Sequence, residues 1–382
     1  MTTPHKNKRA MSLDLARGTM LLLIALAHAP LYLYNAEPGI MSRVQGDGLF
    51  DQIVNYIGMF LIDNRARAMF AVLFGYGLVM AFESRLSKGI PAQEAKRTIR
   101  RRCWYLILFG IALAVVIGGQ DILMAYGLAG LLVGWTLTRG NRTLIRFTII
   151  LTLVYAVLLP FIWSYILQDV GGYGFEPEFT AADTYLHITL ESLIAFPVIP
   201  FIIHAMFPIL PPVLFGMGMA RAQLLTKPAQ RVRTLYILVA LGLTISLLGA
   251  LPVSLLNTVW QPDLSTAGLL YGVHILTGFA GGAAYAALFV IIGIRMKQLG
   301  WLTRALMALG KRSLTFYVWN EALLVLLLSP VALNLGGKLS NGAAAGIAAG
   351  VWGFSVLLAI WLEQSNRNGP LEEGLRRLML RK

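Results

Sequence analysis

Apolar segments long enough to cross a membrane recur along the whole chain. A bilayer's hydrocarbon core is about 30 Å thick, so a spanning helix needs roughly 20 apolar residues. Ten segments of this kind lie near residues 12–34, 66–83, 103–119, 121–138, 143–167, 200–222, 234–256, 268–293, 313–330 and 342–362. Only 13% of the 382 residues are charged, whereas a soluble domain has about a quarter. The sequence therefore predicts an all-α integral membrane protein of about ten spans, in a single domain, 1–382.

The distribution of the basic residues predicts the orientation in the membrane. Cytoplasmic loops of membrane proteins are enriched in Lys and Arg. With the N-terminus inside, nearly all of the 32 Lys and Arg residues fall in or beside inner loops, and the exceptions are Arg43, Arg65, Arg67 and Lys338. Both termini are therefore expected in the cytoplasm, with 1–11 as an arm and 363–382 as a basic tail. Because topology explains the net charge of +14, anionic lipid headgroups are the expected partner and nucleic acid is not.

Two further apolar stretches, 49–62 and 184–199, do not fit this count of spans. Treating either as a span would place the basic loops on the wrong side of the membrane. We expect both to be interfacial or re-entrant helices at the outer face. No long soluble insertion divides the chain, which supports one membrane domain.

Two sequence patterns predict local helix geometry. The segment around His204 is rich in proline, which predicts either a kinked helix or one that is broken at membrane depth. Gly342, Gly346 and Gly350 recur every four residues, as in a face where helices pack closely. The oligomeric state stays open, and a homo-oligomer is compatible with the sequence.

The first apolar segment has two interpretations. Basic residues before it and the small residues Ala25 and Ala27 resemble a cleavable secretory signal. The apolar run continues through Tyr34, however, and it carries Asp14 and Arg17 at its beginning. These features favour an uncleaved first span.

Polar residues inside a span are the strongest candidates for function, because each had an apolar alternative. Asp14, Arg17 and His28 share one helical face of the first span. Asp14 and Arg17 are one turn apart and are expected to pair, either for structure or for binding. His28 lies about 21 Å beyond Asp14, in the outer third of the membrane. Its imidazole suits either a hydrogen-bonded packing role or proton transfer near neutral pH.

The other imidazoles are also predicted to lie toward the outer face. His204 and His274 lie near the outer ends of the sixth and eighth predicted spans, and His187 lies on an outer interfacial segment. No pair of histidines has the short helical spacing of a metal motif. We therefore expect a polar outer cavity rather than a metal site.

The ninth predicted span has four polar residues on one helical face: Ser313, Tyr317, Asn320 and Glu321. Glu321 falls near mid-membrane without an adjacent basic residue, and an intramembrane carboxylate is a candidate for function by default. Lys311 and Arg312 lie at the inner mouth of this span. They could bind a phosphorylated ligand, or they could serve only as markers of topology.

Four segments together resemble the bacterial YeiB family, whose function is unknown: SLDLARGTMLLLIALAH, MFAVLFGYG, GKRSLTFYVWNEALL and GPLEEGLRRL. That family is similar to a wider group of transmembrane acyltransferases. In this group an Asp, Arg, Gly motif opens the first span, and a histidine nearer its far end is catalytic. The matching residues here are Asp14, Arg17, Gly18 and His28. Many YeiB relatives have asparagine at the position of His28, so this chain is closer to the acyltransferase pattern.

The resemblance implies an acyltransferase of the bacterial plasma membrane that uses acyl-CoA as the donor co-substrate. The CoA phosphates would lie near inner-face basic residues such as Lys311 and Arg312, and the acceptor would be an extracytoplasmic glycan, lipid or small molecule. His28 would act as general base, with Asn320 stabilising the oxyanion.

Site roles follow from this interpretation. We assign catalysis to His28, Asn320 and Glu321, and substrate binding to Asp14, Arg17, His204, His274, Ser313 and Tyr317. A proton-coupled transporter or efflux protein is the alternative, because an intramembrane carboxylate and proline-broken spans suit a carrier equally well. A noncatalytic scaffold or sensor is the third class.

Overall fold

The computed structural model describes residues 4–46, 48–224, 228–296 and 300–380, and this part of the chain is helical without a β-strand. The α-helices are α1 (Pro4–His28), α2 (Leu49–Ile57), α3 (Arg65–Leu86), α4 (Ala92–Ala112), α5 (Leu123–Val133), α6 (Asn141–Val170), α7 (Tyr185–Ala195), α8 (Ile199–Met206), α9 (Leu210–Arg221), α10 (Val232–Ser254), α11 (Leu264–Arg295), α12 (Trp301–Lys311), α13 (Ser313–Leu328), α14 (Asn341–Gln364) and α15 (Pro370–Leu380). Short 3₁₀ or π turns are η1 (Ala29–Tyr32), η2 (Gly58–Ile62), η3 (Leu113–Ile117), η4 (Gly134–Thr138) and η5 (Pro228–Arg231).

Six helical segments in the described part of the chain are long and apolar enough to cross a membrane. They are Met11–Tyr32, Leu49–Leu86, Asn141–Val170, Val232–Ser254, Leu264–Arg295 and Asn341–Gln364. All six overlap predicted spans, and the other four predicted spans overlap helices that are shorter, broken or more charged. The stretch 49–62, expected as an interfacial or re-entrant helix, is instead grouped with α3 in the candidate span Leu49–Leu86.

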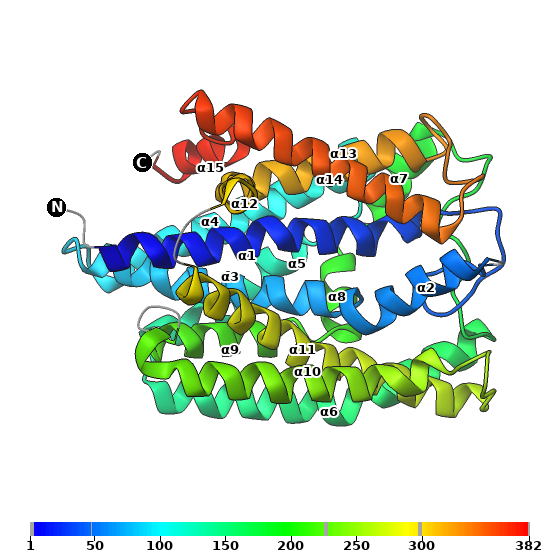
Figure 1. Ribbon diagram of the computed structural model, residues 1–382, viewed down its shortest axis with the longest axis horizontal. Helices are drawn as coiled ribbons and strands as arrows, with labels where there is room; N and C mark the ends of the chain where they lie inside the picture. The colour runs from blue at the N-terminus through cyan, green and yellow to red at the C-terminus, as the bar shows by residue number, and fades with distance from the viewer. Residues whose placement is uncertain (1–3, 47, 225–227, 297–299, 381–382) are drawn as a thin grey trace.

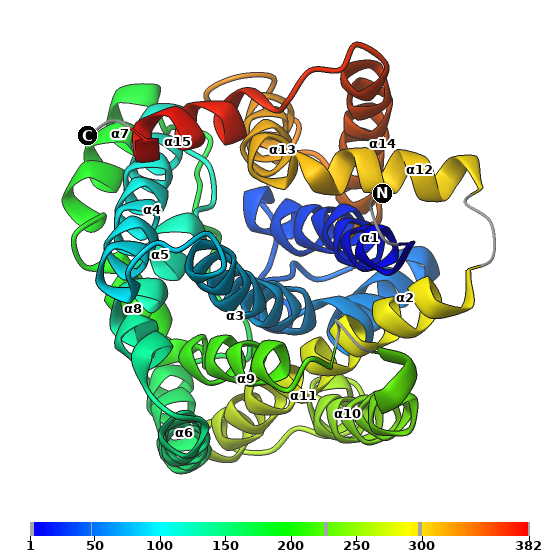
Figure 2. The same cartoon turned by 90° about the vertical axis from the view of Figure 1, so that its left-hand side faces the viewer.

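The long helices run side by side in an elongated bundle (Figure 1). α1 begins and α14 ends at the same end of this bundle, which we call the termini end; the opposite end is the far end. α1 and α3 lie in the middle, with α4 and α5 on one side of them, α13 and α14 on another, and α9, α10 and α11 on a third (Figure 2). α12 lies crosswise at the termini end (Figure 2).

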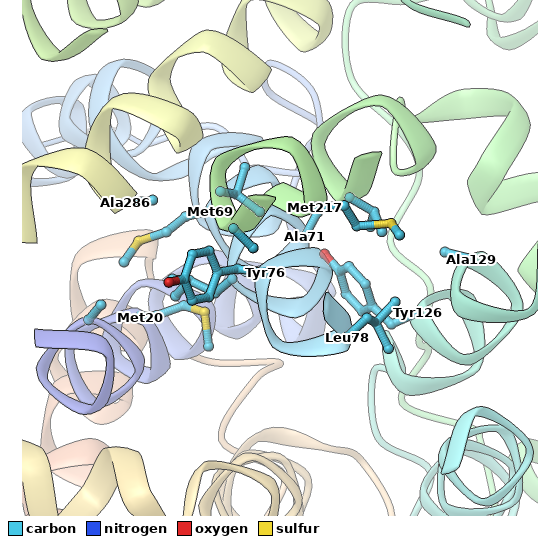
Figure 3. Packing of buried hydrophobic residues seen from close by; sticks show 14 of the residues in the cluster. Met20, Met69, Ala71, Tyr76, Leu78, Tyr126, Ala129, Met217 and Ala286 are labelled. Carbon is cyan, nitrogen blue, oxygen red and sulfur yellow. The ribbon is translucent and has the colours of Figure 1, made fainter. Parts of the chain in front are cut away.

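The main apolar core forms around α3, because this helix carries small and large apolar residues on all sides. Its neighbours supply side chains from every direction. Figure 3 shows the α3 residues Met69, Ala71, Tyr76 and Leu78 among Met20 of α1, Tyr126 and Ala129 of α5, Met217 of α9 and Ala286 of α11. A helix that is apolar all round is expected in the interior of a bundle, so α3 is the structural axis that positions the residues at its ends.

The proline-rich segment is broken rather than kinked. α8 bends by 71° from α7 and ends at Met206, after which Phe207 is extended with φ −137° and ψ 134°. Side chains of α6 satisfy carbonyl groups at the break: Trp163 Nε1 donates to Met206 at 3.0 Å, and the Tyr155 hydroxyl donates to His204 at 2.5 Å. Such replacement bonds are what makes irregular backbone tolerable at membrane depth.

The glycines predicted to form one packing face behave differently from one another. A Cβ on Gly342 would meet Phe50 and Asp51 of α2, whereas a Cβ on Gly346 or Gly350 would meet nothing within 4 Å. The prediction therefore holds within this chain only for Gly342.

Candidate functional site

His28 at the end of α1 bonds to Glu321 in the middle of α13. His28 Nδ1 lies 2.7 Å from Glu321 Oε1, and the second oxygen, Oε2, accepts a hydrogen bond from the Tyr32 hydroxyl at 3.1 Å. The Glu321 side chain is only 1% exposed, and that of His28 is 12% exposed. Because Nδ1 is engaged by the carboxylate, Nε2 is the ring nitrogen available to a ligand.

Two tyrosines fix the linker between η3 and α5 against this pair. The Tyr32 hydroxyl accepts a hydrogen bond from the Gln120 backbone N–H at 2.9 Å. The hydroxyl of Tyr317, one turn before Glu321 on α13, donates to the Gln120 carbonyl at 2.7 Å and accepts from the Ile122 N–H at 3.1 Å. Buried hydrogen bonds thus join α1, α13 and this linker, and they fix the position of His28 relative to Glu321.

His28 lines a cavity of about 280 Å³, which we call the His28 cavity. Its walls come from α1, the 41–43 loop, the start of α3, the 120–122 linker, α6 and α8. Two polar wall residues form a closed pair: Arg43 Nε and Nη2 donate to the two oxygens of Asp63 at 3.0 and 2.9 Å. Asn64, Arg67 and Asp121 also line this space. The site therefore combines an imidazole, an acid and basic donors around a volume large enough for a small ligand.

A second cavity, of about 180 Å³, lies nearer the termini end; we call it the Arg17 cavity. Three cations from three helices line it, namely Arg17 of α1, Arg102 of α4 and Lys311 of α12. The predicted contact between Arg17 and Asp14 is present, with Nη1 and Oδ1 3.8 Å apart. Glu372 also lines the cavity and Lys311 is bonded to Glu363, but the cationic wall residues outnumber the acidic one, which suits an anionic ligand.

Glycines bring α12 close enough to α1 to complete the Arg17 cavity. A Cβ on Gly18 would overlap the carbonyl of Leu306, and a Cβ on Gly310 would overlap the carbonyl of Asp14. Only glycine permits both backbone contacts. The close crossing places Lys311, the residue after Gly310, beside the middle turns of α1, near Asp14.

One face of α1 connects the two cavities. Arg17 and Met20 line the Arg17 cavity, while Ile24 and His28 line the His28 cavity. Arg17 and His28 are eleven positions apart along the helix, or roughly 16 Å. The partition between the cavities at α1 is therefore about one helical turn thick, between Met20 and Ile24.

Residues 219–382 match the model of a family described as "Protein of unknown function (DUF418)". The match confirms the resemblance to this YeiB-like family over the second part of the chain. It includes Lys311 and Glu321, whereas Arg17 and His28 precede it. No curated protein matches the chain. The family description names no activity.

Two other predicted imidazoles, His204 and His274, have partners other than His28. His204 Nδ1 lies 2.6 Å from the Pro200 carbonyl, in the first turn of α8. His274 is fully buried in α11, with Nε2 3.4 Å from Arg65 Nη1. Neither residue lines the His28 cavity. In the described ranges, no three His, Cys, Asp or Glu side chains are grouped as metal ligands.

Two other predicted site residues have structural partners. Asn320 faces α14, where its Oδ1 accepts from the Ser355 hydroxyl at 2.6 Å. Arg312 donates to the Arg367 carbonyl at 2.6 and 3.0 Å and lies 2.8 Å from Glu363, so it fastens the chain after α14 to α13. Neither residue lines either cavity, whereas Ser313 and Tyr317 line the Arg17 cavity.

Sequence reasoning missed several residues that the structure places at the site: Tyr32, Asn64, Arg67, Arg102 and the 120–122 linker. Arg67 did carry a signal, because it is an exception to the distribution of basic residues. Arg102 was hidden inside the strongest basic run, where topology alone explained it. Tyr32 and the linker gave no signal, because their roles depend on contacts between distant segments.

Proposed function

We propose that the protein is a membrane acyltransferase that moves an acyl group from acyl-CoA to an acceptor on the opposite side of the membrane. The observation that carries this proposal is the His28–Glu321 hydrogen bond of 2.7 Å at the wall of a cavity. A general base that is held by a buried carboxylate is a recurring arrangement in acyl transfer. The resemblance of the first span to transmembrane acyltransferases supports the same assignment.

The orientation we propose places the termini end in the cytoplasm of a bacterium. Lys96, Arg97, Arg100, Arg101 and Arg102 precede or begin the apolar part of α4 at that end, which fits the enrichment of basic residues on the cytoplasmic side. The Arg17 cavity would then open toward the compartment that contains acyl-CoA, and the His28 cavity would lie in the outer part of the membrane.

The donor would bind through its phosphates to the Arg17 cavity. Arg17, Arg102 and Lys311 line that cavity, and guanidinium groups bind phosphate oxygens with paired hydrogen bonds. The acyl end of the donor would extend along α1 past Met20 and Ile24 toward His28. This path requires the apolar partition to open when the donor binds.

At the His28 cavity, Nε2 would accept the proton of an acceptor hydroxyl or amine as that group attacks the thioester carbonyl. The new ester or amide bond forms, the carbon–sulfur bond breaks, and the leaving thiolate receives the proton from the imidazolium. Glu321 would act as a positioning residue, because its carboxylate orients the ring through Nδ1 and stabilises the imidazolium. Its burial and its bond from Tyr32 fit this role.

Thermal unfolding of the purified protein with acetyl-CoA, free CoA or ATP tests donor binding. A ligand at 100 times its Kd stabilises the folded state by about 2.7 kcal/mol. We expect acetyl-CoA to raise the Tm of wild type and of His28→Ala alike, since His28 lies outside the Arg17 cavity. In the presence of an acceptor, release of CoA thiol should occur with wild type only. No shift at saturating acetyl-CoA would refute the CoA-dependent mechanism.

A proton-coupled transporter is the second candidate, and one observation favours it. His28, Glu321 and Tyr32 form a buried chain of exchangeable protons near the partition between two cavities. Such a chain can couple proton binding to alternating access. A carrier would move substrate into sealed vesicles without covalent change, and its transport would depend on a pH gradient and on Glu321.

A further inference from the structure

Arg67 brings a buried cation to the wall of the His28 cavity without a carboxylate bonded to it. Its guanidinium lies 3.6 Å above the ring of Phe207, which lines the same cavity. Among the residues that the structure describes, Arg67 Nη1 is buried and has no hydrogen-bond partner. A buried guanidinium N–H without a hydrogen-bond partner costs folding free energy. A bound ligand that accepts a hydrogen bond from Nη1 would recover this cost.

The two neighbouring arginines are satisfied, which sets Arg67 apart. Arg43 makes the paired bonds to Asp63 described above. Arg65 donates to the Ser246 hydroxyl at 2.8 Å, to the Ser246 carbonyl at 2.7 Å and to the carbonyls of Met59 and Asp63 at 2.9 and 2.8 Å. The side chains of Arg43 and Arg65 therefore bond to other parts of the protein. Of the three arginines, Arg67 is the one with a donor available to a ligand.

Asn64 supplies a second unpaired donor in the same place. It precedes α3 in a left-handed conformation with φ 63°, and its side chain makes no capping bond. In the described structure its Nδ2 is buried without a partner, and the residue lines the His28 cavity together with Arg67. Both residues also border a void of about 10 Å³, which is too small for more than one water molecule. The larger His28 cavity is therefore the space in which a ligand of several atoms could lie beside these two residues.

The acidic groups near this cavity have other partners. Asp63 is bonded to Arg43. The oxygens of Asp121 accept the backbone N–H groups of Leu123 and Met124 at 2.8 Å, which caps α5. Glu321 is bonded to His28. The first turn of α3 carries no acidic residue, so the positive end of the helix dipole adds to the charge of Arg67.

We propose that Arg67 and Asn64 bind a carboxylate or phosphate group of the ligand that occupies the His28 cavity. A guanidinium and an adjacent amide donor match the oxygens of such a group. The volume of about 280 Å³ is at the lower end for ligand sites, which fits a sugar acid or a small phosphate ester. This identification of the ligand as the acceptor rests on the proposed function, whereas the anion site itself does not.

The test measures thermal unfolding of the purified full-length protein with two pairs of probes. Glucuronate is compared with glucose, and glycerol 3-phosphate is compared with glycerol. We expect at least one of the two anions to raise the Tm and both neutral compounds to have no effect. A shift with glucuronate would identify a carboxylate ligand, and a shift with glycerol 3-phosphate would identify a phosphate ligand. Arg67→Gln should require roughly tenfold or more of that anion for the same shift, the effect of one lost charged contact.

Control variants separate binding from folding. Asn64→Gly keeps the left-handed backbone while removing the amide, and it should weaken the anion shift in the same direction. Arg146→Gln removes an exposed guanidinium from α6 and should leave the shift unchanged. Equal anion shifts in wild type, Arg67→Gln and Asn64→Gly would overturn the proposal, and so would the absence of any anion-specific shift in wild type.

Acetyl-CoA serves as the reference ligand in the same experiment. Its shift should be retained in Arg67→Gln, because Arg67 does not line the Arg17 cavity. An anion shift without an acetyl-CoA shift would support the anion site and refute the proposed function. An acetyl-CoA shift without an anion shift would refute the anion site and leave the acyltransferase proposal standing.

Discussion

His28 Nδ1 and Glu321 Oε1 lie 2.7 Å apart, although 293 positions separate the two residues in the chain. The contact joins the end of α1 to the middle of α13, and Tyr32 adds a bond to the second carboxylate oxygen. A histidine and a carboxylate that each looked isolated in sequence thus form one unit. This unit is the strongest argument for chemistry in the molecule, because it lies at a cavity and has a defined free ring nitrogen.

Glu321→Gln should reduce acyl transfer while preserving donor binding. The amide can still reach His28, but it carries no charge to stabilise the imidazolium that forms during proton transfer. Loss of effective general-base catalysis should lower kcat about 100-fold or more. The measurement is the rate of CoA thiol release from acetyl-CoA in the presence of acceptor.

Glu176→Gln is the matched control for this prediction, because Glu176 is an exposed carboxylate in the loop after α6. This variant should turn over like wild type. The acetyl-CoA shift in Tm should be equal in both variants, since Glu321 lines neither cavity. Unchanged turnover in Glu321→Gln would contradict the role assigned to the pair.

Tyr317→Phe should lower stability and loosen the linker beside the site. The substitution removes a hydroxyl that bonds both Gln120 and Ile122. A buried donor or acceptor that loses its partner costs about 1–3 kcal/mol. Thermal unfolding of the purified protein measures the loss, and Tyr185→Phe, which removes the hydroxyl of an exposed tyrosine, provides the comparison. Equal Tm values for the two variants would show that the linker does not depend on Tyr317.

The all-helical membrane architecture followed from sequence because it depends on local composition. Runs of apolar residues must form helices in lipid, where every backbone group needs an internal partner. The prolines near His204 signalled irregular backbone, but they could not decide between a kink and a break. That outcome depends on Trp163 and Tyr155 of α6, which bond the carbonyls at the break.

The face of α1 that carries Arg17 and His28 was also predictable, because helical spacing fixes it. The partners of that face were not. Glu321 and Arg102 come from helices whose neighbours are decided by the packing of the whole bundle. The imidazoles of His204 and His274 were expected beside His28 because all three were predicted at a similar depth in the membrane. Depth does not determine which way a side chain points from its helix. Each instead faces buried backbone or Arg65.

Gly18→Ala should destabilise the crossing of α1 and α12. The added Cβ would overlap the carbonyl of Leu306, and overpacking of this kind typically costs about 1–3 kcal/mol. Gly350→Ala is the control, because a Cβ there meets open space and alanine favours a helix by up to about 1 kcal/mol over glycine. Thermal unfolding should therefore show a lower Tm for the first variant and an equal or higher Tm for the second. A Tm for Gly18→Ala at or above that of wild type would contradict the close approach.

Arg102→Gln should weaken the binding of acetyl-CoA. Arg102 lines the Arg17 cavity, and in the described structure its Nε is buried without a hydrogen-bond partner. The loss of one charged hydrogen bond to phosphate should raise the acetyl-CoA concentration needed for a given Tm shift roughly tenfold.

Arg100→Gln removes the same charge from an exposed position in the same basic run. If both residues only set topology, the two variants would bind acetyl-CoA equally. If Arg102 binds the donor, only its replacement weakens binding, and added salt should weaken wild type more than Arg102→Gln because one fewer ionic contact remains to be screened.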